Sequence, residues 1–278
     1  MTIRINVLGP LQVSIDSRDC TPSARMVRRV VALLAMRANR AVQMESLIEE
    51  LWGTEPPPSA VTTVQTYIYH LRKIFAASGV ENVEGTLLVT RPAGYVLQLG
   101  EECLDAQVFE QRTAAGAAML EQHDNHAADT FRQALGMWAG PALADVPMGS
   151  LLQAHVVHLE EVRLSALEMR IQADMRLGRH RQLIGELRSL VASYPLNEWF
   201  HAHLIEGLSR AGRRSEALQA YQHVRTVLCN ELGVDPSPEL QRLQLEVLEG
   251  GASDTPRNAA RLHRRVSVAG GALPHTGR

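Results

Sequence analysis

The chain has 278 residues, of which 45% are apolar and 4% aromatic, and its formal net charge is −2. This composition excludes a wholly disordered chain, and the length allows two domains of roughly 100–200 residues each. No apolar run approaches the ~20 residues that a membrane-spanning helix needs, and no secretory signal is recognisable at the start. The three cysteines form no C-x-x-C pair, which favours unpaired buried thiols over a disulfide framework. We therefore expect a cytoplasmic protein without a membrane segment.

The small net charge hides segments of different sign. Residues 1–99 contain 10 basic and 8 acidic residues, residues 100–249 contain 13 and 21, and residues 250–278 contain 5 and 1. Every basic residue except Lys73 is an arginine. Such a bias is typical of a GC-rich genome, so the arginine content alone does not indicate nucleic-acid binding. Nucleic-acid binding therefore has to be inferred from the positions of the charges along the chain.

The segment that ends at Pro58 predicts two strands and two helices. Residues 3–7 and 11–15 alternate apolar and polar side chains on either side of a Gly-Pro turn, which indicates antiparallel strands. Between residues 25 and 39 the apolar spacing becomes helical. A second short helix at 44–53 stops at a glycine, and three consecutive prolines at 56–58 then break the chain, because proline cannot continue a helix.

A third helix is predicted for residues 59–75 and a hairpin for residues 87–99. Apolar residues recur in the helix at steps of three and four, which places them on one face. The residues on that face are Val61, Val64, Ile68, Leu71 and Phe75. Strands, three helices and a hairpin together predict an α+β winged helix-turn-helix, with an unusually long connection before its third helix.

Residues 104–250 have a nearly continuous helical pattern. Gly178 and Gly212 each precede basic residues and an amphipathic helix. Their separation equals the period of tetratricopeptide repeats, so an all-α, tetratricopeptide-like domain is predicted. A closing helix follows Ser237-Pro238, which has the residue types of an N-cap and a first turn. The remainder is rich in Gly, Ala and Arg and predicts a disordered basic tail. The predicted domains are 1–99, 100–250 and the tail 251–278.

The polar side of the third helix carries hydroxyls, rings and cations but no acid. A helix whose apolar side rests on a small core can lay its other side in the major groove. Threonines suit thymine methyls and base edges, and arginine and lysine neutralise phosphates. The polar residues concerned are Thr62, Thr63, Thr66, Tyr69, His70, Arg72 and Lys73. Arg91, at the hairpin tip, is placed to enter a neighbouring minor groove. The alternative is a solvated helix with incidental threonines.

Other chemistry finds little support in the sequence. Three close pairs of histidines, at 123/126, 155/158 and 201/203, lack a carboxylate or cysteine at a ligand-like spacing, so we expect no metal site. Neither a P-loop nor a nucleophile elbow is present. The adjacent acids Glu49 and Glu50 are interpreted as solvated, and the three tryptophans as packing residues. We therefore expect no enzymatic activity and no cofactor.

The ordered motifs resemble a known family. The first half contains "VLGPLQV", "RANRAV", "ESLIEELWG", "PPPSAVTTVQTYIYHLRKIF" and "TRPAGYVL". These motifs resemble the winged-helix domain of the OmpR/PhoB type and, more closely, that of the Streptomyces antibiotic regulatory protein family. The second half contains "WAGPALADV", "LEEVRLSALEMRI" and "LSRAGRRSEALQAYQHVRTVLCNELGVDPSPEL", which resemble the bacterial transcriptional activation domain that follows in this family. The resemblance covers about residues 3–248.

The resemblance implies a sequence-specific transcriptional activator, associated with the nucleoid, that controls a secondary-metabolite or antibiotic biosynthetic gene cluster. Its partners would be direct repeats in double-stranded promoter DNA and RNA polymerase, through the sigma or alpha subunit. Repeats about one helical turn apart would place two protomers side by side, as a homodimer on DNA. The segment 53–58 corresponds to the loop that faces polymerase in winged-helix activators.

The resemblance also implies roles for individual residues. Residues 59–75 would be the recognition helix and residues 87–99 the wing. The base-facing residues would be Thr62, Thr63, Thr66 and His70. The phosphate-facing residues would be Tyr69, Arg72 and Lys73. In the wing, Arg91 would enter the minor groove and Tyr95 would anchor the wing or touch the DNA backbone. Many relatives carry Ser-Arg where this chain has Tyr69-His70, so we expect a weaker or missing arginine contact to guanine.

Two interpretations of the helical half remain open. Tetratricopeptide-like stacks form concave grooves that bind peptides, which would make the chain a protein-binding adaptor or ligand sensor without specific DNA binding. Alternatively, this half packs on the winged helix, supports self-association and presents a surface to polymerase. We favour the second interpretation, because the acidic excess of residues 100–249 keeps this half away from DNA.

Overall fold

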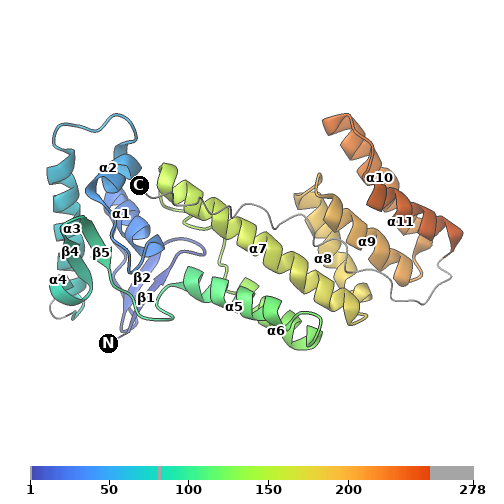
Figure 1. The fold of residues 1–278 in the computed structure, drawn as a ribbon, viewed down its shortest axis with the longest axis horizontal. Coiled ribbons are helices and arrows are strands. Elements are labelled where there is room, and N and C mark those ends of the chain that lie inside the picture. The colour runs from blue at the N-terminus through green and yellow to red at the C-terminus, as the bar shows by residue number, and fades with distance from the viewer. Residues whose placement is uncertain (1, 81–82, 251–278) are drawn as a thin grey trace, which may run out of the picture. The chain divides into compact units, whose positions relative to one another are not determined.

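The computed structural model describes residues 2–80 and 83–250. These residues form two compact units, one that ends at Arg179 and one that begins at His180, and each is described by itself (Figure 1). The predicted basic tail at 251–278 lies outside the described residues.

The first unit begins with a small antiparallel sheet. Its strands β1 (Ile3–Asn6), β2 (Gln12–Ile15) and β3 (Arg18–Asp19) pair in that order, with Ile5 opposite Val13. Alternation buries every second residue of β1, which confirms the two predicted strands. Strand β3 is too short to leave a periodic pattern in the sequence.

Three helices and a hairpin follow, as a winged helix-turn-helix requires. The elements are α1 (Arg25–Met36), α2 (Met44–Trp52), α3 (Ala60–Ala77), the short α4 (Val83–Thr86), β4 (Leu88–Arg91) and β5 (Gly94–Leu97). Helix α2 ends at Gly53, whose φ of 63° is in the left-handed region that glycine adopts without strain. Strands β4 and β5 pair as the predicted hairpin, with Arg91 opposite Gly94. Helix α4 was not predicted.

The apolar face of α3 differs from the prediction at its first position. Val64, Ile68, Leu71 and Phe75 are buried, but Val61 is 47% exposed. Ala60 takes the place expected for Val61 in the core. An α-helix has about 3.6 residues per turn, so a residue four positions before Val64 returns closer to the buried stripe than a residue three positions before it.

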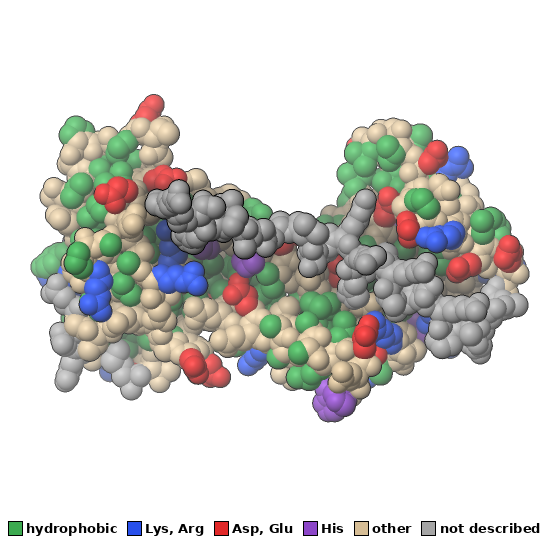
Figure 2. Space-filling view, in the orientation of Figure 1, with side chains coloured by type: hydrophobic (Ala, Val, Ile, Leu, Met, Phe, Trp, Pro, Cys, Tyr) green, Lys and Arg blue, Asp and Glu red, His purple; other side chains and the backbone are tan. Residues whose placement is uncertain are grey.

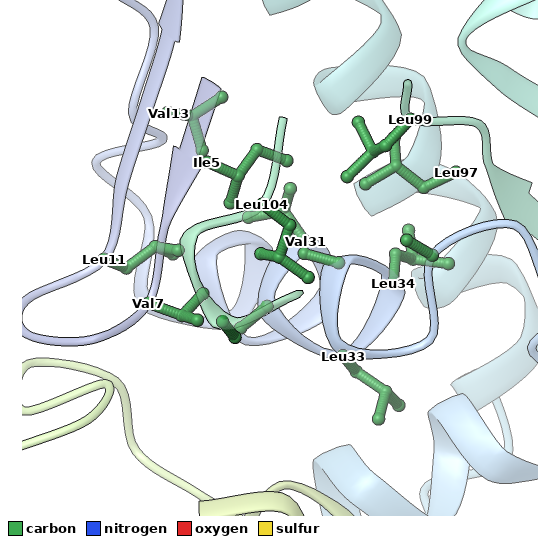
Figure 3. Packing of buried hydrophobic residues seen from close by; sticks show 14 of the residues in the cluster. Ile5, Val7, Leu11, Val13, Val31, Leu33, Leu34, Leu97, Leu99 and Leu104 are labelled. Carbon is green, nitrogen blue, oxygen red and sulfur yellow. The ribbon is translucent and has the colours of Figure 1, made fainter. Parts of the chain in front are cut away.

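The core of the winged helix continues into the first helices of the second half. Helices α5 (Asp105–Met119), α6 (Asp124–Leu135) and α7 (Ser150–Arg176) belong to the same compact unit. One buried cluster runs from Ile3 to Ala166, and Figure 3 shows Leu104 beside Ile5 and Val31. Backbone bonds also cross, from Ile5 N to Cys103 O (2.7 Å) and from Leu143 N to Val7 O (3.0 Å). Residues on the two sides of the predicted domain border at 99/100 therefore pack into one hydrophobic core.

A buried carboxylate holds α6 and the end of α7 together. Asp174 is 2% exposed and accepts hydrogen bonds from Arg132 (2.5 Å), Arg170 (3.2 Å) and Arg179 (2.9 Å). Arg170 is itself buried. Such a buried charge is tolerated only because it is surrounded by opposite charges and hydrogen-bond donors.

The second unit contains, in chain order, α8 (His180–Ser193), α9 (Glu198–Arg210), α10 (Arg214–Leu232) and α11 (Pro238–Glu249). The predicted turn at Gly212 has a φ of 78°, and Ser237 caps α11 by accepting a hydrogen bond from Leu240 N. The predicted repeat of paired helices is confirmed, since α8 packs on α9 and α9 on α10. Figure 2 shows acidic and basic side chains intermixed over this unit on the visible face.

Two sequence-level expectations concern cysteines and membrane helices. Cys20, Cys103 and Cys229 are all free thiols, but only Cys20 is buried and Cys229 is exposed. The expectation of buried thiols is therefore wrong for Cys229 on α10. Within residues 2–80 and 83–250, no helix combines the length and apolar character needed to cross a bilayer.

Candidate nucleic-acid interface

The periodicity of the helix decides which side chains of α3 share its exposed side. Residues seven apart are almost two turns apart and leave the helix in nearly the same direction. Two such rows, formed by the pairs 62/69 and 66/73, line the side opposite the core, and the pairs 65/72 and 63/70 lie on the two flanks beside them. The first two rows, with Thr62, Tyr69, Thr66 and Lys73, are exposed throughout. The structure therefore brings the predicted polar residues of α3 onto one surface.

The threonine hydroxyls on this surface are partly engaged by the helix itself. Thr66 donates to the carbonyl of Thr62 at 2.9 Å, and Thr63 donates to the carbonyl of Ser59 at 2.9 Å. Each hydroxyl has only one proton to donate, so these two side chains present a methyl group and acceptor lone pairs. Thr66 is exposed, whereas Thr63 is half-buried. Their chemistry suits thymine methyls and amino groups of bases.

Two rings and an ammonium group form a cluster near the middle of α3. The Lys73 ammonium lies 5.2 Å from the centroid of the Tyr69 ring, within range of a cation–π interaction. The Tyr69 and His70 rings meet edge to face with centroids 5.9 Å apart. Tyr69 is 54% exposed, and nothing acidic lies on α3. This cluster is a positively charged, hydrogen-bonding surface.

Arg72 connects α3 to the wing. Its guanidinium donates to the carbonyl of Leu88 at 3.0 and 3.3 Å and to the hydroxyl of Thr90 at 2.8 Å. The side chain is half-buried, so part of the cation predicted to contact phosphate is used to hold β4 against α3. Arg72 therefore sets the position of the wing relative to the helix.

The second strand of the wing, β5, is hydrogen-bonded to the loop that precedes α2. Tyr95 exchanges backbone hydrogen bonds with Val42 (2.8 and 3.0 Å), and its side chain is 8% exposed. Gly94 lies so close that an added Cβ would stand 2.0 Å from the carbonyl oxygen of Val42, and its φ is 141°. Only glycine fits there. Of the two residues predicted for wing contacts, Arg91 is exposed and Tyr95 lies in the core.

Arg91 borders a hollow between the wing tip and the start of α2. The hollow has a volume of about 370 Å³ and is lined by Gln43, Met44 and Glu45 on one side and by wing residues 90–95 on the other. Arg91 itself is exposed at the tip of the wing.

A buried carboxylate fastens α2 to α7. Glu50 is 1% exposed and accepts hydrogen bonds from the backbone N–H groups of Gly149 (2.5 Å), Leu151 (3.0 Å) and Leu152 (3.0 Å). Arg29 of α1 donates to the same carboxylate at 3.0 Å. Glu50 thus satisfies the free N–H groups at the start of α7, where the helix dipole favours a negative charge.

The interpretation of Glu50 as a solvated acid is therefore wrong, while its neighbour Glu49 is exposed as expected. Adjacent residues do point apart on a helix, and here one of the two points inward. Glu50 lies three positions after Leu47 and therefore on the apolar side of α2, and this spacing could have predicted its burial. Gly149 could not be found from sequence, because its role comes from the close approach of Arg29 and Glu50.

Two further aspartates make similar connections. Asp105, the first residue of α5, accepts hydrogen bonds from Val7 N (2.8 Å) and Leu8 N (3.1 Å). Burial raises the pKa of Asp105 above its ordinary value, although these N–H groups oppose the rise. Asp145 accepts from Leu11 N at 2.8 Å and pairs with Arg28. Together with Glu50, these carboxylates fix the winged helix to α5–α7.

The chain matches two protein-family models. Residues 22–97 match "Transcriptional regulatory protein, C terminal", and residues 104–248 match "Bacterial transcriptional activator domain". The chain is also 41% identical over 271 residues to the regulatory protein DnrI of Streptomyces peucetius, covering 96% of this chain and 99% of that protein. The chain belongs to the Streptomyces antibiotic regulatory protein family. The regulator is thus a DNA-binding transcriptional activator, as the motifs predicted.

Two further matches cover most of this regulator. It is 36% identical to the transcriptional regulator RedD of Streptomyces coelicolor over 88% of this chain and 70% of that protein. Its structure resembles that of Mycobacterium tuberculosis EmbR in complex with a low-affinity phosphopeptide, with a TM-score of 0.81 and 30% identity. That match covers 89% of this chain and 65% of EmbR. The predicted fold class, a winged helix followed by a helical activation domain, is confirmed.

Proposed function

We propose that this regulator binds direct repeats in the promoters of an antibiotic or other secondary-metabolite gene cluster and recruits RNA polymerase there. The observation that carries the proposal is the exposed, acid-free side of α3, joined by Arg72 to a wing with an exposed arginine at its tip. The names of relatives such as the regulatory proteins DnrI and AfsR support a regulatory pathway of this kind.

The proposed division of labour follows the family matches. Residues 1–99 bind DNA, residues 100–250 activate transcription, and neither part performs catalysis. Thr62, Thr66 and His70 face bases, with Thr63 at the edge of the surface, and Lys73 and Tyr69 face phosphate. Arg91 enters the minor groove. Tyr95 is buried and anchors the wing to the core.

The proposed partners are a second protomer on the adjacent repeat and the sigma or alpha subunit of RNA polymerase. The connections made by Glu50, Asp105 and Asp145 favour this arrangement, because they carry the orientation of the DNA-bound helix directly into α5–α7. A polymerase-binding surface on those helices is thereby held at a defined angle to the promoter. Such a protein would act in the cytoplasm, bound to the nucleoid.

A salt titration tests the proposed function. Duplexes from the promoters of the regulator's own gene cluster and random duplexes are titrated by gel shift at several salt concentrations. We expect log K to fall linearly with log salt on both, because binding releases counterions, and the promoter duplex to bind at least about 10³-fold more tightly. Equal affinity for both duplexes, or binding indifferent to salt, would favour the protein-binding adaptor instead.

Arg72 and Lys73 give a prediction that separates anchoring from charge. Arg72→Ala is expected to weaken binding to promoter and random duplexes alike, because the wing loses its attachment to α3. Lys73→Ala should also weaken binding to both duplexes, because a phosphate contact is lost, and should reduce the slope of log K against log salt by about 1. Arg72→Lys keeps the charge but cannot reach Leu88 and Thr90 with a planar fork, so most of the loss should persist.

The matched variants are His70→Ala and Thr66→Ala, which should relax sequence preference and spare random-duplex binding. If Arg72→Lys binds like the unaltered protein in the same gel shifts, Arg72 acts only as a charge.

A further inference from the structure

Gln65 occupies the side of α3 that faces the wing. It lies almost two turns before Arg72, so both side chains leave the helix on the same flank. Arg72 binds Leu88 and Thr90 of β4, which identifies that flank as the one beside the wing. Gln65 is exposed there, whereas His70 and the half-buried Thr63 occupy the opposite flank.

The amide of Gln65 is available for a new hydrogen-bonding partner. Within residues 2–80 and 83–250, no side chain or backbone group forms a hydrogen bond with it. Thr66, by contrast, already donates its only hydroxyl proton to Thr62 O, and Lys73 is drawn over the Tyr69 ring. Gln65 therefore keeps both an acceptor oxygen and an NH₂ donor on the exposed side of α3.

A wing and a recognition helix reach the same duplex in neighbouring grooves. Gln65 is exposed next to Thr66 on the flank of α3 beside the wing, so it borders the surface that would enter the major groove. No acidic side chain on α3 competes for the amide or repels the phosphates. The position combines solvent exposure with hydrogen-bonding groups that no other described residue engages.

We propose that Gln65 is a specificity-determining residue that reads an adenine in the major groove, on the wing side of α3. A glutamine amide can accept from the N6 amino group of adenine and donate to N7 at the same time, a pattern that distinguishes A·T from the other base pairs. The proposal rests on the proposed function and adds a position that is absent from the base-facing residues assigned above from the sequence.

Selection from a randomised duplex library tests this assignment. The full chain, Gln65→Ala and Gln133→Ala each select their preferred sites, and the selected sequences are compared position by position. Gln133 is an exposed glutamine on α6 and serves as the matched control. We expect Gln65→Ala to lose about tenfold of the preference for adenine at one position in each repeat. Other positions and random-duplex affinity should stay unchanged, and Gln133→Ala should select the original site.

Gln65→Glu provides an independent measurement. A carboxylate only accepts hydrogen bonds and suits the amino group of cytosine, so the adenine at that position should be replaced by cytosine. An unaltered consensus from Gln65→Ala, or a uniform loss of preference at all positions, overturns the assignment while leaving the proposed function intact. Failure of the full chain to select any consensus overturns the proposed function and the Gln65 assignment together.

Discussion

Glu50→Ala is expected to lower the free energy of unfolding of the unit that ends at Arg179 by about 3–5 kcal/mol. Removing the carboxylate leaves the N–H groups of Gly149, Leu151 and Leu152 without their acceptor and leaves the nearly buried Arg29 without its anion. Breaking one side of a buried pair costs more than the pair contributes, because the remaining charge stays desolvated.

Urea unfolding followed by tryptophan fluorescence measures this effect. Trp199 is replaced by Phe in all variants, so that the signal comes from Trp52 and Trp138 in the first unit. With a urea dependence of about 1–3 kcal/mol per molar, the midpoint should fall by at least about 1 M.

Glu49→Ala is the matched control for Glu50. Glu49 is the adjacent acid of α2 and accepts an exposed hydrogen bond from Ser150 Oγ at 3.1 Å. Its replacement should shift stability by no more than about 0.5 kcal/mol. Similar losses from both variants would show that the connection at the start of α7 does not stabilise this unit.

Glu50→Ala also has an expected functional consequence. Because α3 itself is not altered, DNA affinity at a temperature where the variant stays folded should change little. Activation of a promoter reporter should fall more than DNA occupancy, since α7 is no longer held at a defined angle to the winged helix. Parallel losses of occupancy and activation would argue against the proposed mechanical role of this connection.

Asp174→Ala is the second large change, again expected to cost about 3–5 kcal/mol. Arg132, Arg170 and Arg179 would lose the carboxylate that they share, and three cations would then face each other without it. Arg170 is buried and cannot turn into solvent without disrupting α7. The same fluorescence experiment should report a lower urea midpoint for the first unit.

Asp129→Ala is the control for Asp174. It removes a different partner of Arg132, an exposed aspartate on the preceding turn of α6. Exposed ion pairs contribute about 0–1 kcal/mol, so the midpoint should stay nearly constant. If Asp174→Ala unfolds at the same urea concentration as this control, the buried cluster makes no net contribution to stability.

Local patterns were enough to predict the polar side of α3 and the elements other than the short β3 and α4. Alternation in residues 3–15, helical spacing in 25–75 and the repeated glycine-helix pattern after Gly178 and Gly212 are all visible in the order of residue types alone. Amphipathic periodicity decides these features because burial of one face stabilises each element, whatever the rest of the chain does. The same periodicity predicted which residues of α3 share the polar side, with an error of one position at Val61.

Tertiary structure alone decided which polar groups are used inside the molecule. Glu50, Asp105 and Asp174 resemble surface acids in the sequence. Glu50 and Asp174 are nevertheless buried and Asp105 is half-buried, and each accepts hydrogen bonds from distant segments of the chain. Arg72, predicted from the sequence to contact phosphate, also attaches the wing to α3. A charge is stable in the interior only where distant N–H groups and cations converge on it, and that convergence is a property of the folded chain.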